Sequence, residues 1–483
     1  MKRIYNYFYP LLVLFVFQNL SIVRAQTTFQ KVFTGAYDMD GLDVIPAQGG
    51  GYIITGMITN DIIDDMDIHI IKTDNNGDTE WTKTYGGNSP EYSFNILQAT
   101  DASGYYIIGY TQSFGSGDYD TWLLKINNSG DTLWTKRYGS WGNDQGKEII
   151  PTSDGNYILV GYSNSATYPD YQAYLIKINP AGNIIWNKYY GGSNMEIGNS
   201  VKQCPDGGYI MFGQTFSYGN GNGDAYLVKT NALGDTVWTK TYGGTQGDEG
   251  ICVVANNDGT YVLCVRDSST AGNDIDVQII KTDATGGIIW DKNYGGDKKD
   301  TDKMIEPTTD GGYVVAAISR SFGWNLPNMW ILKLNSDGDT LWTRTYGGQD
   351  NEHCYAVRET TDGGFIAVGK TESFSSADGI MFLKLNSQGQ LGTVGIDKLY
   401  TDNIINIFPN PAEENITINF NSESPYSVLT VSNILGQIVH SEKIDQPGQH
   451  ISKTINLKDK ESGIYFLTLE TTKQITKTRF ILK

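Results

Sequence analysis

Apolar positions along the chain occur in short runs rather than with a helical period. Seven such runs follow glycine-rich turns, and they begin at Tyr52, Tyr105, Tyr157, Tyr209, Tyr261, Tyr313 and Phe365. Proline is nearly absent from these runs. Short apolar runs bounded by glycine turns are typical of β-strands, so the pattern predicts an all-β fold.

A phrase of the form WTKTYGG repeats along the chain. Its tryptophans are Trp81, Trp134, Trp186, Trp238, Trp290 and Trp342, with a first step of 53 residues and later steps of 52. Phe29, in the phrase FQKVFTG, lies 52 residues before Trp81 and begins a degenerate seventh copy. A period this regular indicates a repeat architecture.

Each repeat predicts four antiparallel strands. The first contains a fixed Ile or Val, a DGG-like turn leads to the second, the third ends in a lysine, and a GDT-like turn leads to the tryptophan strand. Glycine after Asn or Asp supplies the positive φ of such hairpin turns. This organisation predicts a seven-bladed β-propeller of four-stranded blades over residues 26–390. A solenoid is the alternative, but it would need atypical capping repeats.

The two ends of the repeat region are complementary. The fragment around Phe29 contains a fourth strand alone, whereas the last unit, residues 350–389, lacks one. We therefore expect the Phe29 strand to pair with the strand of Ile380 to Leu385, which closes the ring and leaves no free edge.

The first 25 residues have the pattern of a signal peptide. Lys2 and Arg3 precede an apolar core at residues 11–17, and Val23 and Ala25 occupy the −3 and −1 positions. The sequence predicts cleavage before Gln26, with an uncleaved anchor as the alternative. No later segment approaches the roughly 20 apolar residues of a membrane helix, so we expect no transmembrane anchor after processing.

Charge and cysteine content narrow the choice of partners. A formal net charge of −18 argues against a nucleic-acid partner, which selects a basic face. The four cysteines lack metal-ligand spacing. Cys252 and Cys264 lie symmetrically about Asp258 in a predicted hairpin, so they either form a disulfide, which export permits, or are small buried thiols.

The repeat ends after Leu391, and residues 391–403 have the character of a linker. The phrases that follow are NIFPNPAEENITINF, YSVLTVSNILGQIVHSEKI, SGIYFLTLE and KTRFILK. Their marked residues are Pro409, Asn410, Pro411, Gly436 and Gly463. Residues 404–483 thus resemble the type A sorting domain of the Bacteroidetes type IX secretion system. An ordinary Ig-like binding domain is the alternative.

The resemblance to this sorting domain carries several implications. It implies a small Ig-like β-sandwich that engages the type IX secretion machinery and is then cleaved. It also implies that the mature protein is released, or lies at the cell surface on the exterior of the outer membrane.

No catalytic motif is present. The chain has four histidines, none at a fixed place of the repeat, and HExxH, GxSxG, P-loop and dinucleotide patterns are absent. The hairpins DNNGDTEW and SDGDTLW resemble the Asp-box of sialidases and the tryptophan-docking hairpin of quinoprotein dehydrogenases. Those motifs are structural in their families, which implies that the repeated tryptophans pack between blades. We expect no organic cofactor.

Acidic residues also follow the repeat. A carboxylate stands ten residues after each tryptophan, at Glu91, Asp144, Glu196, Asp248, Asp300 and Glu352. A second, broken series precedes the third strand, at Asp67, Asp120, Asp224 and Asp276. The first series either fixes the entry turn of each blade through hydrogen bonds or forms a ring that holds a cation such as Ca²⁺.

The longer loops of the predicted blades share one face, opposite the tight turns. Varied loops on a rigid scaffold commonly carry function. One place in these loops is aromatic, at Phe114, Tyr218, Phe322 and Phe374, which form a binding platform or merely pack the loops. The leading hypothesis is an exported, non-enzymatic module that binds a glycan or another surface macromolecule. The alternatives are a glycoside hydrolase with two carboxylates at the channel mouth and a structural protein of the cell envelope.

Overall fold

The structure is a computed structural model that divides into two compact units, Met1–Gly392 and Thr393–Lys483. It describes residues 26–483 except 60–64, 117, 166–167, 267–275, 325, 375–376, 393–405, 410, 423–426, 434–436, 445–448 and 472–474. The predicted signal peptide and most of the predicted linker lie outside the described residues. In the described part of the chain, no helix is long and apolar enough to span a bilayer.

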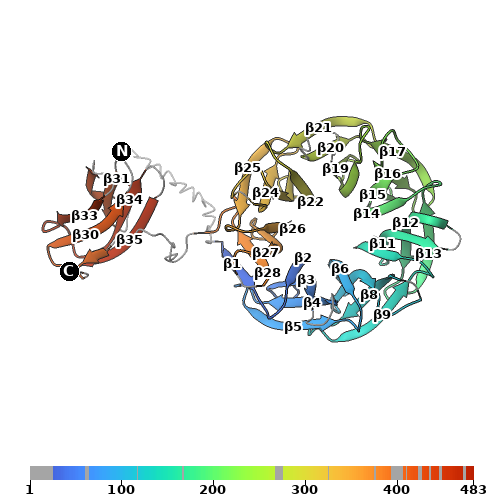
Figure 1. Cartoon of the computed structure of the whole chain (residues 1–483), viewed down its shortest axis with the longest axis horizontal. Helices are drawn as coiled ribbons and strands as arrows, with labels where there is room; N and C mark the ends of the chain where they lie inside the picture. Colours follow the sequence, from blue (N-terminus) through green and yellow to red (C-terminus); the bar gives the residue numbers. More distant parts are fainter. Residues whose placement is uncertain are drawn as a thin grey trace, which may run out of the picture. The chain divides into compact units, whose positions relative to one another are not determined.

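The first unit is a ring of seven four-stranded antiparallel sheets around a central opening (Figure 1). This arrangement confirms the predicted all-β fold with a seven-bladed propeller. From the centre outward, blade 1 consists of β2 (Met39–Pro46), β3 (Tyr52–Thr59), β4 (Met66–Thr73) and β5 (Thr79–Tyr85). Blade 2 consists of β6 (Glu91–Gln98), β7 (Tyr105–Thr111), β8 (Asp120–Ile126) and β9 (Thr132–Tyr138). Blade 3 consists of β10 (Asp144–Pro151), β11 (Tyr157–Ser165), β12 (Tyr168–Ile178) and β13 (Ile184–Tyr190).

Blades 4 to 7 follow the same order. Blade 4 consists of β14 (Glu196–Gln203), β15 (Tyr209–Thr215), β16 (Asp224–Thr230) and β17 (Thr236–Tyr242), and blade 5 of β18 (Glu249–Ala255), β19 (Tyr261–Arg266), β20 (Val277–Thr282) and β21 (Ile288–Tyr294). Blade 6 consists of β22 (Asp300–Pro307), β23 (Tyr313–Ser319), β24 (Asn328–Leu334) and β25 (Thr340–Tyr346). Blade 7 contains β26 (Glu352–Glu359), β27 (Phe365–Thr371) and β28 (Gly379–Leu385).

The fourth strand of blade 7 comes from the other end of the propeller. Strand β1 (Phe29–Phe33) pairs antiparallel with β28, with Phe29 opposite Lys384 and Phe33 opposite Ile380. The predicted closure of the ring is therefore confirmed. Because β1 covers the edge of β28, blade 7 has as many strands as the other blades.

An aromatic ring packed against a glycine joins each blade to the next. At the GDT-like turn, a glycine in left-handed conformation lies against the tryptophan of the preceding blade; a Cβ on Gly130, at φ +79°, would come within 2.9 Å of Trp81. The hydroxyl of Tyr85 donates to the carbonyl of Gly130 at 2.5 Å. Between blades 7 and 1, Phe29 takes the place of the tryptophan against Gly77. We call these junctions the seams.

Cysteines lie within the propeller core. Cys252 and Cys264 are cross-strand partners in blade 5, as the symmetric spacing predicts. All four cysteines are buried free thiols in the structure.

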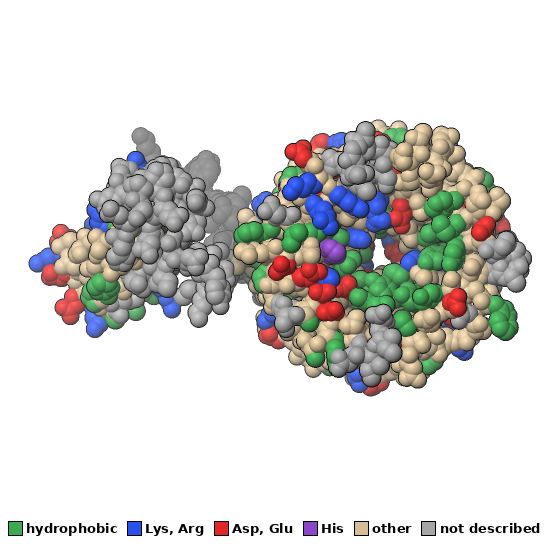
Figure 2. Space-filling view, viewed as in Figure 1, with side chains coloured by type: hydrophobic (Ala, Val, Ile, Leu, Met, Phe, Trp, Pro, Cys, Tyr) green, Lys and Arg blue, Asp and Glu red, His purple; other side chains and the backbone are tan. Residues whose placement is uncertain are grey.

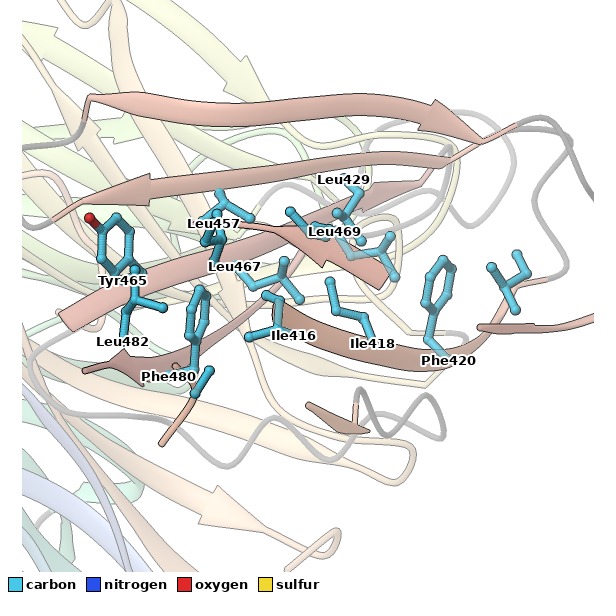
Figure 3. Close-up of a cluster of buried hydrophobic side chains, with 14 of the residues drawn as sticks. Ile416, Ile418, Phe420, Leu429, Leu457, Tyr465, Leu467, Leu469, Phe480 and Leu482 are labelled. Carbon is cyan, nitrogen blue, oxygen red and sulfur yellow. The ribbon is translucent and has the colours of Figure 1, made fainter. Parts of the chain in front are cut away.

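The second unit consists of two packed sheets. One contains β29 (Asn406–Phe408), β30 (Asn415–Ser422) and β33 (Gln449–Asn456); the other contains β31 (Ser427–Asn433), β32 (Ile438–Ile444), β34 (Gly463–Thr471) and β35 (Ile475–Leu482). Apolar side chains from both sheets, among them Ile418, Phe420, Leu467 and Phe480, form its core (Figure 3). This is the predicted β-sandwich.

Three of the marked sorting-domain residues lie among the described residues. Gly463 begins β34 with open space around it, and Pro411 is exposed. The next residue, Ala412, exchanges backbone hydrogen bonds with the C-terminal strand, to Ile481 and from Lys483. Pro409 is also exposed, and Asn410 and Gly436 lie outside the described residues.

Candidate functional site

The repeated carboxylates close the turns that enter the innermost strands. Glu91 is fully buried, and its carboxylate accepts hydrogen bonds from the Gly87 amide at 2.8 Å and the Thr111 hydroxyl at 2.6 Å. The backbone amide four residues earlier donates to the equivalent carboxylates Asp144, Glu196, Asp248, Asp300 and Glu352. Hydrogen bonds of this kind are those expected if each carboxylate fixes the entry turn of its blade.

The second acidic series has comparable contacts. Asp120 accepts a hydrogen bond from the amide of Ser116 at 3.0 Å, and Asp224 accepts one from Gly221 at 3.2 Å. Asn328, which replaces the carboxylate in blade 6, donates to the carbonyl of Leu326 at 2.6 Å. Among the described residues, no three His, Cys, Asp or Glu side chains are grouped so that they could hold a metal ion.

The repeated loop aromatics pack against their own blades. Phe114 contacts the ring of Trp122 with a centroid distance of 5.6 Å, and Phe322 contacts Trp330 at 5.3 Å. The Phe114 ring also lies over Gly87, where a Cβ would approach it to 3.2 Å. The four residues Phe114, Tyr218, Phe322 and Phe374 are nevertheless between 39% and 46% exposed. An open hollow of about 340 Å³ lies beside Phe114 and Trp122 in blade 2.

A different set of residues lines the channel mouth, where the innermost strands begin. In each of these strands the register shifts by one residue, which leaves a bulge residue without a partner. The bulge residues, from blade 1 to blade 7, are Leu42, Phe94, Lys147, Asn199, Ile251, Lys303 and Tyr355. Unlike the carboxylates, they differ from blade to blade.

Blades 2 and 3 bring aromatic rings together at this mouth. Tyr92 stacks on Tyr110 with a centroid distance of 5.7 Å and an interplanar angle of 8°, and Phe94 lies 4.8 Å from Tyr92. The aromatic cluster consists of Tyr92, Phe94, Tyr110, Tyr119, Tyr162 and Tyr171, and all six rings are partly exposed. Sequence reasoning missed this cluster because its members do not repeat.

Lys147 connects the two halves of the aromatic cluster. Its ammonium lies 3.6 Å from the ring centroid of Phe94 and 5.3 Å from that of Tyr162. Such cation–π contacts are strongest where water is excluded. Burial lowers the pKa of Lys147 to about 7, although the carboxylate of Glu249 opposes this shift.

The remaining blades give the mouth charged sectors. Figure 2 shows Lys and Arg side chains gathered beside the opening in the sector of β22 to β26, and Asp and Glu side chains in the neighbouring sector of β2 and β28. In the acidic sector, Lys370 pairs with Glu372 at 3.0 Å and also with Asp378. Burial raises the pKa of Asp40 to about 6, and the ammonium of Lys370 opposes this rise.

Farther along the innermost strands, polar side chains join the blades around the channel. Arg358 of blade 7 donates to Asp43 of blade 1 at 3.0 Å, and Asn95 of blade 2 donates to Asp43 at 2.9 Å. Glu148 of blade 3 accepts from the Ser200 hydroxyl of blade 4 at 3.0 Å. These contacts are structural and leave the mouth as the variable surface.

The fold defines a repeat β-propeller followed by a β-sandwich. Residues 406–483 match the family model described as a secretion system C-terminal sorting domain, which covers most of the second unit. This domain indicates export by the type IX secretion system, to the cell surface or the medium. No curated protein sequence matches the chain.

Several solved structures are similar to this chain. PorZ, a surface component of the type IX secretion system of Porphyromonas gingivalis, has a TM-score of 0.39 and 12% identity over 90% of this chain. The match covers 58% of PorZ. The propeller domain of the trilobed protease from Pyrococcus furiosus has a TM-score of 0.43 and 8% identity, over 76% of this chain and 100% of that domain. These likenesses are too weak to transfer function.

Proposed function

We propose that the exported propeller is a binding module that holds a glycan at the channel mouth. The observation that carries this proposal is the partly exposed aromatic cluster of blades 2 and 3. Partly exposed aromatic rings gathered at the mouth of a rigid scaffold are suited to the apolar faces of sugar rings.

Comparison among the seven blades supports the same surface. Positions with a structural task have the same residue type in nearly every blade, as the seam glycines show. The position of Tyr110 is occupied by Tyr162, Gln214, Arg266, Ile318, Lys370 and Met57 in the other blades. Since the blade tolerates all of these side chains, its packing does not require tyrosine there.

The proposal is tested by glycan-array binding of the chain that begins at Gln26, followed by calorimetry with the strongest neutral glycan. The variant Tyr110→Gln/Tyr162→Gln introduces the residue that blade 4 already has as Gln214, so the fold should be retained. We expect affinity to fall about tenfold or more, because two anchoring rings are lost.

The control is Phe114→Ala/Tyr218→Ala, which removes two rings of the repeated loop series on the same face. We expect this control to bind like the parent protein. If the control loses binding and the Tyr110/Tyr162 variant keeps it, the loop rings are the platform and the proposal is wrong.

One observation favours glycoside hydrolysis as a second candidate. The raised pKa of Asp40, about 6, is that of a carboxyl group able to act as a general acid near neutral pH. Release of reducing ends from bound glycans, abolished by Asp40→Asn, would support hydrolysis; binding without release supports the binding module.

A further inference from the structure

A cluster of cations stands at the mouth in a strongly acidic protein. The chain has a net charge of −18, yet blades 5 and 6 place Arg266, Lys298, Lys299, Lys303 and Arg320 around the start of β22. We call these residues the cation cluster. They are neighbours: the amide of Arg320 donates to the carbonyl of Lys299 at 3.2 Å, and the charges of Arg266 and Lys299 act on Lys303.

Most of these cations lack an acidic partner. Arg266 pairs with Glu249 at 2.5 Å. Within the described part of the chain, no carboxylate lies within ion-pair distance of Lys298, Lys299, Lys303 or Arg320. Unpaired like charges held together repel one another and lower the stability of the fold. An anion at this position would remove that repulsion.

The acidic residues of the same strand offset the charge of the cluster only in part. The carboxylate of Asp300 accepts backbone hydrogen bonds from Gly296, Arg320 and Ser321. Asp302 is fully buried, and burial raises its pKa, although the charges of Arg266 and Lys303 oppose this rise. Asp297 is the exposed carboxylate of this turn.

His353, in the neighbouring blade 7, is affected by the positive charge of this sector. The pKa of His353 is lowered to about 4, mainly by burial and also by the charges of Lys303 and Lys370. The charge of Arg320 also lowers the pKa of His353, whereas the carboxylate of Glu372 raises it. The sector therefore disfavours a further positive charge.

The repeat does not require these cations. The residues equivalent to Lys303 include Phe94 and Asn199, and those equivalent to Arg320 include Gln112 and Glu372. Because other blades fold with neutral or acidic side chains at these positions, the cluster is a specialisation of blades 5 and 6. It lies at the same mouth as the aromatic cluster of blades 2 and 3.

We propose that the ligand of the mouth is an acidic oligosaccharide, whose carboxylate or sulfate groups are bound by the cation cluster while its sugar rings contact the aromatic cluster. This inference rests on the proposed function. Arginine and lysine together suit such groups, since guanidinium binds oxyanions through two parallel hydrogen bonds and ammonium acts as a point charge.

The test uses pairs of glycans with the same sugar backbone, of which one member is negatively charged and the other is neutral. The probes are oligogalacturonate with its methyl-esterified form, and a sulfated galactan oligosaccharide with its desulfated form, measured by calorimetry on the chain from Gln26. We expect the charged member of at least one pair to bind about tenfold more tightly than the neutral member, with a preference that weakens as salt increases.

The decisive variant is Lys299→Asn/Lys303→Asn/Arg320→Gln, which introduces residues found at equivalent positions in other blades: Asn143, Asn199 and Gln112. We expect it to lose the preference for the charged glycan. The control, Lys136→Gln/Lys188→Gln/Lys240→Gln, removes as many charges from the outer strands β9, β13 and β17 and should keep the preference.

The outcomes separate this inference from the proposed function. Equal binding of charged and neutral glycans, or a preference that survives in the triple variant, overturns the inference. If Tyr110→Gln/Tyr162→Gln weakens the binding of neutral glycans in that same experiment, the proposed function stands without the inference. Charge-dependent binding that the tyrosine variant leaves unchanged supports the inference and overturns the aromatic site. No binding to any of the four probes overturns the inference, and the neutral glycans of the array then decide the proposed function.

Discussion

The seams between the blades and the channel mouth are built by opposite rules. At each seam an aromatic ring lies on a glycine of the next blade, seven times around the ring. At the mouth, the bulge residues range from Leu42 and Phe94 to Lys147 and Tyr355. The difference shows that positions with the same residue in every blade are those that the fold requires. Positions that vary from blade to blade belong to surface that is free for other functions.

Removal of residues 26–35 should have the largest effect on the stability of the propeller, because it deletes one seam and exposes the edge of β28. We expect the free energy of unfolding of the propeller to fall by about 4 kcal/mol or more, with aggregation through the open edge. Thermal melting and light scattering measure both effects. Phe29→Trp, which restores the residue of the other seams, is the control and should melt no lower than the parent.

A single methyl group at a seam should have the next largest effect. Gly130→Ala places a Cβ 2.9 Å from Trp81, whereas Gly155→Ala has the same φ of +79° with nothing within 4 Å. Both changes strain the backbone, so their difference measures the seam contact. We expect Gly130→Ala to be less stable than Gly155→Ala by about 1–3 kcal/mol in denaturant unfolding. Equal stabilities would mean that the tryptophan can move aside without cost.

Asp302 stands at a place in the innermost strand where blades 2, 3 and 4 have small residues, namely Ser93, Gly146 and Gly198. Its pKa is raised in the folded state by burial, so folding is penalised at pH values above the ordinary pKa of an aspartate. We expect Asp302→Ser to raise the melting midpoint at pH 7 by about 1–3 °C. The gain should shrink as the pH falls through the raised folded-state pKa and vanish below the unfolded one. A gain that is independent of pH would point to packing instead.

The smallest effect on stability is expected at the mouth. Tyr110→Gln/Tyr162→Gln should change the free energy of unfolding by less than about 1 kcal/mol, because equivalent positions in other blades contain polar side chains. Chemical denaturation measures this value directly. A large loss would show that the aromatic cluster is part of the core, and the contrast between seam and mouth would fail for blades 2 and 3.

The sequence is sufficient to predict the architecture because the period fixes it. The spacing of Phe29 from Trp81 predicts the pairing of β1 with β28, which is confirmed. The mouth is harder to predict, since the bulge in each innermost strand shifts the alternation of side chains and Phe94 cannot be assigned to the channel by counting. Candidates chosen because they repeat, such as Glu91 and Phe114, have turn-closing or packing contacts in the structure.

Pairing between the first and last strands of the propeller also has a kinetic consequence. The hydroxyl of Thr28 accepts a hydrogen bond from the amide of Gly392, 364 positions later. Contacts between segments so distant in the chain form slowly, because a long loop must close first. The six complete blades can fold as they emerge, but strand β1, which emerges first, must wait for strands β26 to β28 of blade 7, which emerge last. Closure is therefore expected as the last folding step, and until then β28 offers its open edge to any other β1 nearby, a route to exchange of the N-terminal strand between molecules.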